Sequence, residues 1–343
     1  MSKVKLASWI DKDKLDWDWL SGNLSDKAMQ LLAENPDKIN WCRLSSNPSE
    51  AAMQLMEEKI KEEENNWNWS ILRKNIDSIT WYQLSRNSSA AAMRIIIKHQ
   101  DNIDWCWLSG NSSDGALQLL ENNQDKIDWY WLSSNRSLRA MQLLENNQDK
   151  IVWPILSSNP SPHAVWLLKK NQDKIHWDNL SANLSEDAGR LLAANLDRVY
   201  WTRLSGNSSD AAGKLLVENQ DKIHWGFLSA NRSDVAMQLL ENNLDKKIDW
   251  TALSKNWSAM RILEKHPDKI NWYCLSANQS AKAMQLLENN PDKIRDYMEL
   301  SRNPTEGAMR ILKNNQDEID WKWLSRNPCI FVSDYSDNNC KKA

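Results

Sequence analysis

One short motif dominates this chain: Trp-x-x-Leu-Ser-x-Asn returns about every 24 residues along its 343 positions. From Trp81 to Trp225 the step is 24 each time, whereas the extra lysine of Lys246–Lys247 lengthens a later one. Repeats of about 20–50 residues form arrays in which each unit packs on the next. The motif therefore predicts a row of small units rather than one globular core. Its first residue, called the anchor below, is Trp17, Trp41, Trp69, Trp81, Trp105, Trp129, Trp153, Trp177, Trp201, Trp225, Trp250, Trp272, Tyr297 and Trp321.

Each unit is expected to fold as two short helices, as the copy that starts at Asp128 illustrates. Asp128 is a good N-cap for a first helix that contains the anchor Trp129. The motif Asn, here Asn135, tolerates the left-handed backbone that often ends a helix, and we expect it to do so in every copy. The motif Ser, here Ser133, is expected to bond the backbone near that helix end. Ser137 then caps the second helix with its hydroxyl.

The second helix has one apolar face. In the same copy it carries Ala140, Met141, Leu143 and Leu144, which at 100° per residue span roughly 160°. The alanine recurs in every complete unit, so we expect neighbouring helices to approach closely there. The methionine that often follows could form an adaptable binding stripe. Because it lies inside the apolar face, core packing is the better interpretation.

A period of 24 also suits leucine-rich repeats, so a strand-based fold is the rival. Their strand needs an apolar residue two positions before the leucine. Here Asp18, Pro154 and Gly226 occupy that position, and proline is a poor residue for a central strand. The pattern therefore favours an all-α solenoid, right- or left-handed, of about thirteen short helix-turn-helix repeats. Such hairpins are expected to point the anchor indoles into the core and the next two side chains outward.

The organisation expected along the chain has three parts. Residues 1–13 precede the pattern and form an N-terminal cap, since the ends of an array need caps. Residues 14–328 form the helical repeat array, with a degenerate half-unit near 57–80. Residues 329–343 leave the pattern as a C-terminal tail that we expect to be partly disordered.

Composition points to the cytoplasm. The net charge is −3, with acidic and basic residues interleaved. No apolar run approaches membrane-spanning length and the N-terminus lacks the core of a signal peptide, so neither a membrane nor secretion is expected. The five cysteines form no close pair, which suits a reducing compartment.

No catalytic residue, cofactor or metal site stands out. The five histidines are scattered along the chain, and the motif serines are too regular to be nucleophiles. Carboxylates are abundant, but they lie in the recurrent loop or on the solvated helix face. The chain is therefore expected to be non-enzymatic.

The two residues that follow each anchor vary more than packing would allow at a buried position. Tryptophan, tyrosine and arginine are common there, and these residue types dominate interface energetics. Aligned along a solenoid they would form a partner-binding surface; alternatively, they lean on the preceding unit. The residue between Ser and Asn, as in Arg86, Arg302 and Arg326, also varies and is expected to border this surface. The candidate partner-binding residues are Trp19, Arg43, Tyr82, Trp107, Tyr130, Trp131, Arg203, Phe227, Tyr273 and Trp323.

Units such as Ile175-His-Trp-Asp-Asn-Leu-Ser-Ala-Asn183 resemble the tandem repeats of proteins abundant in giant nucleocytoplasmic large DNA viruses. The resemblance covers nearly the whole chain, and Asn327-Pro-Cys-Ile-Phe331 is similar to the motif that closes such arrays. Most units here have two extra residues before the alanine, and the chain ends soon after Tyr335. That family has no established activity, so the resemblance implies a repeat scaffold in a viral setting, in the host cytoplasm or the virion.

Two classes of function remain. The first is a protein–protein interaction scaffold or structural component that binds a protein partner through the variable aromatic surface. The second is a binder of single-stranded nucleic acid, RNA above all, in which each unit contacts one base. The balanced charge disfavours nucleic acid, because phosphate contacts normally require a basic face.

Overall fold

The computed structural model describes residues 4–65, 78–295 and 297–333. The chain forms two compact units, Met1–Asn123 with Asp296–Ala343, and Gln124–Arg295. Both units repeat one pair of helices, and the two strands among the described residues are three residues long each. The fold is therefore the all-α repeat solenoid that the motif predicts.

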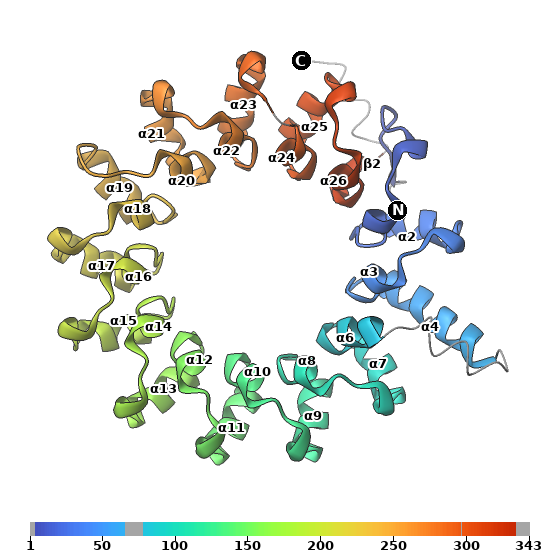
Figure 1. The fold of residues 1–343 in the computed structure, drawn as a ribbon, viewed down its shortest axis with the longest axis horizontal. Coiled ribbons are helices and arrows are strands. Elements are labelled where there is room, and N and C mark those ends of the chain that lie inside the picture. Colours follow the sequence, from blue (N-terminus) through green and yellow to red (C-terminus); the bar gives the residue numbers. More distant parts are fainter. Residues whose placement is uncertain (1–3, 66–77, 296, 334–343) are drawn as a thin grey trace. The chain divides into compact units, whose positions relative to one another are not determined.

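In the unit Gln124–Arg295 the first helix of each repeat lies on the inner side of the curve that the repeats follow, and the second on the outer side (Figure 1). The first helices are α10 (Trp129–Ser134), α12 (Trp153–Ser158), α14 (Trp177–Ser181), α16 (Trp201–Ser205), α18 (Trp225–Leu228), α20 (Trp250–Lys255) and α22 (Trp272–Ser276). The second helices are α11 (Leu138–Asn146), α13 (Pro162–Lys170), α15 (Glu186–Ala193), α17 (Asp210–Glu218), α19 (Asp234–Asn242), α21 (Met260–Lys265) and α23 (Ala281–Asn289).

The other unit has the same two layers and contains both ends of the chain. Its first helices are α1 (Trp17–Leu20), α3 (Trp41–Ser45), α6 (Ser78–Arg86), α8 (Trp105–Ser109), α24 (Met298–Arg302) and α26 (Trp321–Arg326). Its second helices are α2 (Asp26–Ala33), α4 (Glu50–Asn65), α7 (Ala90–Lys98), α9 (Asp114–Asn122) and α25 (Glu306–Lys313). The expected half-unit near 57–80 falls partly on α4; the anchor Trp69 and the rest of residues 66–77 lie outside the described residues.

A short 3-10 turn follows most second helices, an element that the sequence pattern does not predict. Just before it, an asparagine ends the helix through its side chain: Asn147 Nδ2 donates to the carbonyl of Leu143 at 2.8 Å. These turns are η2 (Pro36–Lys38), η3 (Gln100–Asn102), η4 (Gln124–Lys126), η5 (Gln148–Lys150), η6 (Gln172–Lys174), η7 (Leu196–Arg198), η8 (Gln220–Lys222), η10 (Pro267–Lys269), η11 (Pro291–Lys293) and η12 (Gln316–Glu318). Three further 3-10 turns lie elsewhere: η1 (Lys12–Lys14) precedes α1, and η9 (Trp257–Ala259) and η13 (Pro328–Ile330) follow first helices.

The predicted N-caps are confirmed. Asp128 accepts hydrogen bonds from the N–H groups of Tyr130 and Trp131 at 3.0 and 3.1 Å, and so starts α10. Ser137 Oγ accepts from the N–H of Ala140 at 3.2 Å and starts α11. These side chains satisfy helix N–H groups that have no partner within the helix.

The motif asparagine has a different role from the one predicted. No described residue has a positive φ, and Asn135 has an extended backbone at φ −69°, ψ 133°. The prediction that this residue ends the helix in a left-handed conformation is therefore wrong. Its side chain joins consecutive repeats instead: Asn207 Nδ2 donates to the carbonyls of Ser181 and Asn183, at 3.1 and 2.9 Å. Asn207 is 3% exposed, so this bridge is made by a buried amide.

The motif serine makes a second connection between repeats. Ser181 Oγ donates to the carbonyl of its own anchor, Trp177, at 2.8 Å, which confirms the predicted bond near the helix end. The same oxygen accepts from the N–H of Tyr200, the residue before the next anchor, at 3.0 Å. Serine and asparagine thus recur because together they fasten each repeat to the next.

The core lies between the two layers of helices. The motif leucines, such as Leu132, and the recurrent alanines, such as Ala140, are fully buried. Most methionines that follow the alanine are buried as well, among them Met141 at 0% exposure, which confirms core packing. Met237 and Met309 are half-buried exceptions.

The anchor indoles are less buried than predicted. Of the described anchors only Trp81 counts as buried, at 9% exposure, and the others are half-buried. Cations from the 3-10 turns lie over several of the rings: Lys38 is 4.5 Å from the ring centre of Trp17, and Lys222 is 5.0 Å from that of Trp201. The indoles therefore close the edge of the core under a cation instead of filling its centre.

The first and last repeats are joined as neighbours within the same unit. The N–H of Asp16 donates to Ser325 Oγ at 2.8 Å, and Asn23 Nδ2 donates to the carbonyls of Ser325 and Asn327 at 3.1 and 3.3 Å. These are the same bonds that link consecutive repeats. We call this contact, defined by Asp16, Asn23, Ser325 and Asn327, the terminal joint.

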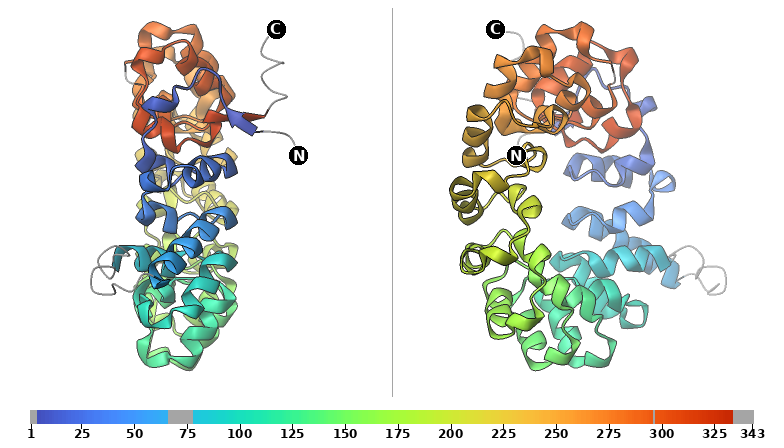
Figure 2. Two further views of the ribbon diagram at one scale, coloured as in Figure 1. Left: turned by 90° about the vertical axis from the view of Figure 1, so that its right-hand side faces the viewer. Right: turned by 60° about the vertical axis from the view of Figure 1, so that its left-hand side comes forward.

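Two short strands lie beside the terminal joint. β1 (Val4–Leu6) pairs antiparallel with β2 (Phe331–Ser333), with Lys5 opposite Val332. Figure 2 shows the two strands side by side, β1 in blue and β2 in red. Segments from the expected N-terminal cap and from the C-terminal tail thus form one small sheet. Residues 334–343 of the tail lie outside the described residues.

Candidate partner-binding surface

All ten candidate residues lie on first helices, one or two residues after the anchor. Four are exposed: Tyr130 at 50%, Phe227 and Tyr273 at 46% each, and Arg203. The other six are half-buried, namely Trp19, Arg43, Tyr82, Trp107, Trp131 and Trp323. Four of the side chains therefore reach solvent as expected, and the other six do so only in part.

Several half-buried candidates lean on a neighbouring repeat, as the alternative interpretation holds. The ring centres of Tyr82 and Trp107 are 4.5 Å apart, at 80° to each other. Among the exposed residues, Arg203 Nε donates to Asp178 Oδ1 of the preceding repeat at 2.9 Å. These contacts join neighbouring repeats. The side chains that make them are therefore less available to bind a partner.

The most concentrated group of such contacts lies at the terminal joint. The ring centres of Trp19 and Trp323, from the first and last repeats, are 4.6 Å apart. Arg43 lies 4.0 Å from the ring centre of Trp19, and Arg302 lies 5.0 Å from that of Trp323. Two further cations complete what we call the cationic tryptophan cluster: Lys322 and Arg326, 5.4 and 5.7 Å from the ring centre of Trp19.

The residue between the motif Ser and Asn borders this surface, as predicted. Arg302 and Arg326 belong to the cluster, and Arg86 lies 5.2 Å from the ring centre of Trp107. Lys322 was not among the candidates. Its position directly after an anchor is the same as that of Tyr130, so its place in the repeat could have identified it.

The exposed aromatic residues lie in the unit Gln124–Arg295. Tyr130 and Trp131 meet edge to face, with ring centres 5.6 Å apart. Phe227 meets the imidazole of His224 at 4.9 Å, and its N–H donates to His224 Nδ1 at 3.3 Å. Each pair leaves one ring about half exposed, Tyr130 and Phe227, and aromatic residues are enriched at protein interfaces.

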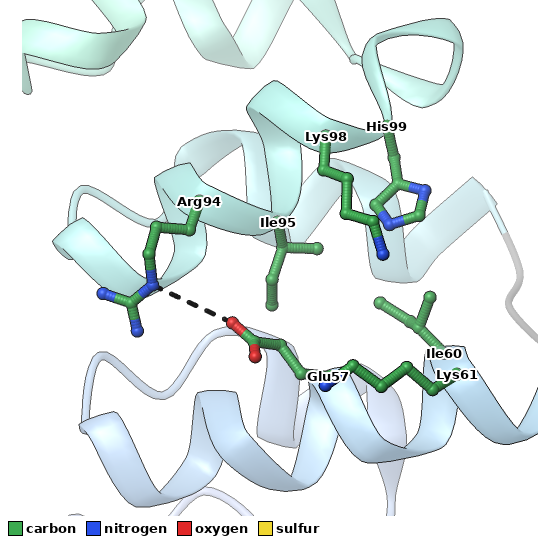
Figure 3. A pocket seen from close by; sticks show the side chains of 7 residues that line it. All are labelled: Glu57, Ile60, Lys61, Arg94, Ile95, Lys98 and His99. Carbon is green, nitrogen blue, oxygen red and sulfur yellow. Dashed lines mark ion pairs between the residues drawn. The ribbon is translucent and has the colours of Figure 1, made fainter.

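A small pocket of about 190 Å³ lies on the opposite layer, between α4 and α7 (Figure 3). Ile60 and Ile95 form its apolar wall, and Arg94 pairs across it with Glu57 at 3.9 Å. Lys61, Lys98 and His99 complete the lining. The one carboxylate of the lining, Glu57, is the group that Arg94 pairs with.

The described residues contain no set of three histidine, cysteine or carboxylate side chains placed to hold a metal ion. Among the described residues, Tyr297, Cys329 and Glu241 have a shifted pKa. Burial raises the pKa of the Tyr297 hydroxyl and of the Cys329 thiol, and nearby carboxylates add to both shifts. The pKa of Glu241 is lowered, chiefly by its hydrogen bond from Lys265. These groups belong to separate repeats and do not form a common site.

Comparison with protein-family models, with curated proteins and with solved structures finds no match for this chain. The interpretation of the surface therefore depends on its own geometry. Within the part of the chain that the structure describes, no helix has both the length and the apolar character needed to span a membrane.

Proposed function

We propose that this chain is a non-enzymatic repeat scaffold that binds a protein partner through the layer of first helices. The observation that carries the proposal is a set of three exposed aromatic residues in one layer: Tyr130, Phe227 and Tyr273 are each 46–50% exposed. Tyr130 and Tyr273 directly follow an anchor, and Phe227 lies two residues after one, in three different repeats. Large rings held on short, capped helices offer contact area at little cost in conformational entropy.

Single-stranded nucleic acid is the alternative partner. A readout of one base per unit would need a stacking side chain at a fixed position in every repeat. The second position after the anchor instead holds Ile155, Asn179 and Ala252 in three repeats of the unit Gln124–Arg295. The surface therefore favours a protein partner, whose contacts need not follow the period of the array.

The resemblance to the repeat proteins of giant viruses supports a viral setting for the scaffold. In that setting the protein would work in the cytoplasm of the host cell or in the virion. The two-layer array agrees with a scaffold role, because repeat arrays commonly use one extended face to bind.

The proposal is tested by affinity capture from cells that express the chain, with two matched triple variants. The first replaces the aromatic residues of the inner layer: Tyr130→Ser, Phe227→Ser and Tyr273→Ser. The second replaces exposed apolar residues elsewhere in the same unit: Leu184→Ser, Leu196→Ser and Val217→Ser, which are 41–56% exposed. A partner that binds the wild type and the second variant, but not the first, is the expected result. Equal retention by both variants would contradict the proposal.

A further inference from the structure

The cationic tryptophan cluster is organised around two indoles in contact. Trp19 and Trp323 are half-buried and 4.6 Å apart, so each ring has neighbours that limit its movement. Arg43 is half-buried against Trp19 at 4.0 Å, whereas Arg302, Arg326 and Lys322 are exposed. Four cations are thus gathered on one pair of rings that is itself fixed by the terminal joint.

A guanidinium group that lies over an indole keeps its N–H edge available. The face of the group contacts the ring, while the donors point outward in its plane, where they can bind a carboxylate in pairs. None of Arg43, Arg302, Arg326 and Lys322 forms an ion pair with a described carboxylate. By contrast, Arg203, which like Arg43 lies two residues after its anchor, is paired with Asp178. Within the described part of the chain, the cluster is therefore a preorganised set of donors without an anionic partner.

The charge of this surface is opposite to that of the chain. The chain has a net charge of −3, with more carboxylates than cations. On the described first helices of the unit that contains both ends, cations predominate at the three variable positions. The cations are Arg43, Arg86, Arg302, Lys322 and Arg326, and the carboxylates are Asp18 and Glu299. A local basic patch on an acidic protein attracts anions to one place and repels them from the rest.

We propose that the cationic tryptophan cluster binds an acidic segment of a partner protein, whose carboxylates are taken by Arg43, Arg302, Arg326 and Lys322. The inference rests on the proposed scaffold function and names the chemistry of one partner. The contacts favour a peptide over single-stranded nucleic acid, because cations and the second ring already cover the indoles on which bases would stack. In the unit Gln124–Arg295 the same three positions hold two cations, Arg203 and Lys255, and Arg203 is paired with Asp178.

The test is fluorescence anisotropy of the full chain with three labelled probes: a ten-residue glutamate peptide, a glycine–serine peptide of equal length, and a ten-nucleotide oligo-dT. We expect the glutamate peptide alone to bind, and to bind more weakly as salt is added. The variant Arg43→Gln, Arg302→Gln, Arg326→Gln should weaken binding by about tenfold or more, the effect of losing charge-assisted hydrogen bonds.

The matched control removes the same charge elsewhere: Arg190→Gln, Arg203→Gln, Arg261→Gln. These arginines are exposed and pair with Asp187, Asp178 and Glu241. Binding by this control should stay within about twofold of the wild type, since ions far from the probe are screened by salt. The single variant Lys322→Gln, at an exposed side chain, keeps the test valid if the triple variant unfolds; it should weaken binding measurably while the melting temperature stays unchanged.

Three results would overturn the inference. Failure of the glutamate peptide to bind at low salt would leave the cluster a structural part of the terminal joint. Equal weakening of binding by the control and by the cluster variant would mean attraction by net charge alone. Tighter binding of oligo-dT, lost in the cluster variant, would assign the cluster to nucleic acid. None of these results bears on capture through Tyr130, Phe227 and Tyr273, so the scaffold proposal stands or falls separately.

Discussion

The backbone N–H of Asp16 donates a hydrogen bond to Ser325 Oγ at 2.8 Å, although 309 residues separate the two in the chain. The bond repeats one made between consecutive units, as between the N–H of Asn40 and Ser21 Oγ at 2.9 Å. Array proteins usually need polar capping units, because each end exposes an unpaired face. Here the faces of the first and last repeats cover each other through the terminal joint.

The terminal joint should contribute as much stability as an internal contact. Asn23→Ala removes an amide that is 0% exposed and leaves the carbonyls of Ser325 and Asn327 without their donor. Asn159→Ala does the same to Ser133 and Asn135 inside the array. Each change is expected to cost about 1–3 kcal/mol, the penalty for buried groups left without a partner. Urea denaturation followed by circular dichroism measures both.

Similar losses from the two variants would show that the joint is formed in solution. A loss from Asn159→Ala together with a negligible one from Asn23→Ala would mean that the first and last repeats are apart. Ser208→Ala serves as the control, since this side chain is exposed and a surface change of this kind costs within about 0.5 kcal/mol.

Trp129 and Trp131 should contribute more equally to stability than a division into core and surface implies. Both indoles are half-buried, so we expect Trp129→Ala and Trp131→Ala each to cost less than the ~3–5 kcal/mol of a fully buried tryptophan. Leu132, one residue further along α10, is 0% exposed, and Leu132→Ala should cost about 2–5 kcal/mol. Thermal melting of the three variants gives the order. A much larger loss of stability from Trp129→Ala than from Leu132→Ala would show that the anchor indole lies in the centre of the core.

Local patterns in the sequence account for most of the repeat. The cap at Ser137 and the apolar face around Leu144 depend on neighbours within a few residues, so spacing alone predicts them. The bridge from Asn207 could not be predicted, because its acceptors lie 24 and 26 residues earlier and the asparagine also suited a helix end. The contact of Asp16 with Ser325 is beyond any local pattern for the same reason.

The sequence predicts which positions form the candidate surface, but it does not predict which of these side chains contact one another. The variability after each anchor identified Trp19, Arg43 and Trp323, and the residue before the motif Asn identified Arg302. That these side chains form one cluster follows only from the terminal joint, which places the last repeat beside the first. The half-buried state of the anchors was also missed, because a hydrophobic pattern does not show that a lysine of the 3-10 turn will cover the ring.

Acid should weaken the contact between α19 and α21. The pKa of Glu241 is lowered in the folded chain, chiefly by the hydrogen bond from Lys265 and also by the charge of Arg261. A lowered pKa means that this carboxylate stabilises the fold above its unfolded pKa, and that the contribution is lost as the pH falls through the folded value. Glu241→Gln should therefore lower the melting temperature at pH 7, and this difference should shrink as the pH falls into the acid range where the carboxylate takes up its proton. A difference that stays constant over this range would contradict the assignment.

The close approach of α15 and α17 should be visible in a double-mutant cycle. A Cβ added at Gly189 would collide with the Cβ of Ala211 on the next repeat. Alanine is favoured over glycine inside a helix by about 1 kcal/mol, so an unhindered Gly189→Ala would stabilise the chain. The collision is expected to reverse the sign, with a net loss of about 1–2 kcal/mol, because both backbones are fixed by the bridges of Asn183 and Asn207. Ala211→Gly removes the obstructing methyl group, and in that background Gly189→Ala should become neutral or stabilising. Melting curves of the two single variants and the double variant give the coupling; additive effects would show that α15 and α17 are further apart than this contact requires.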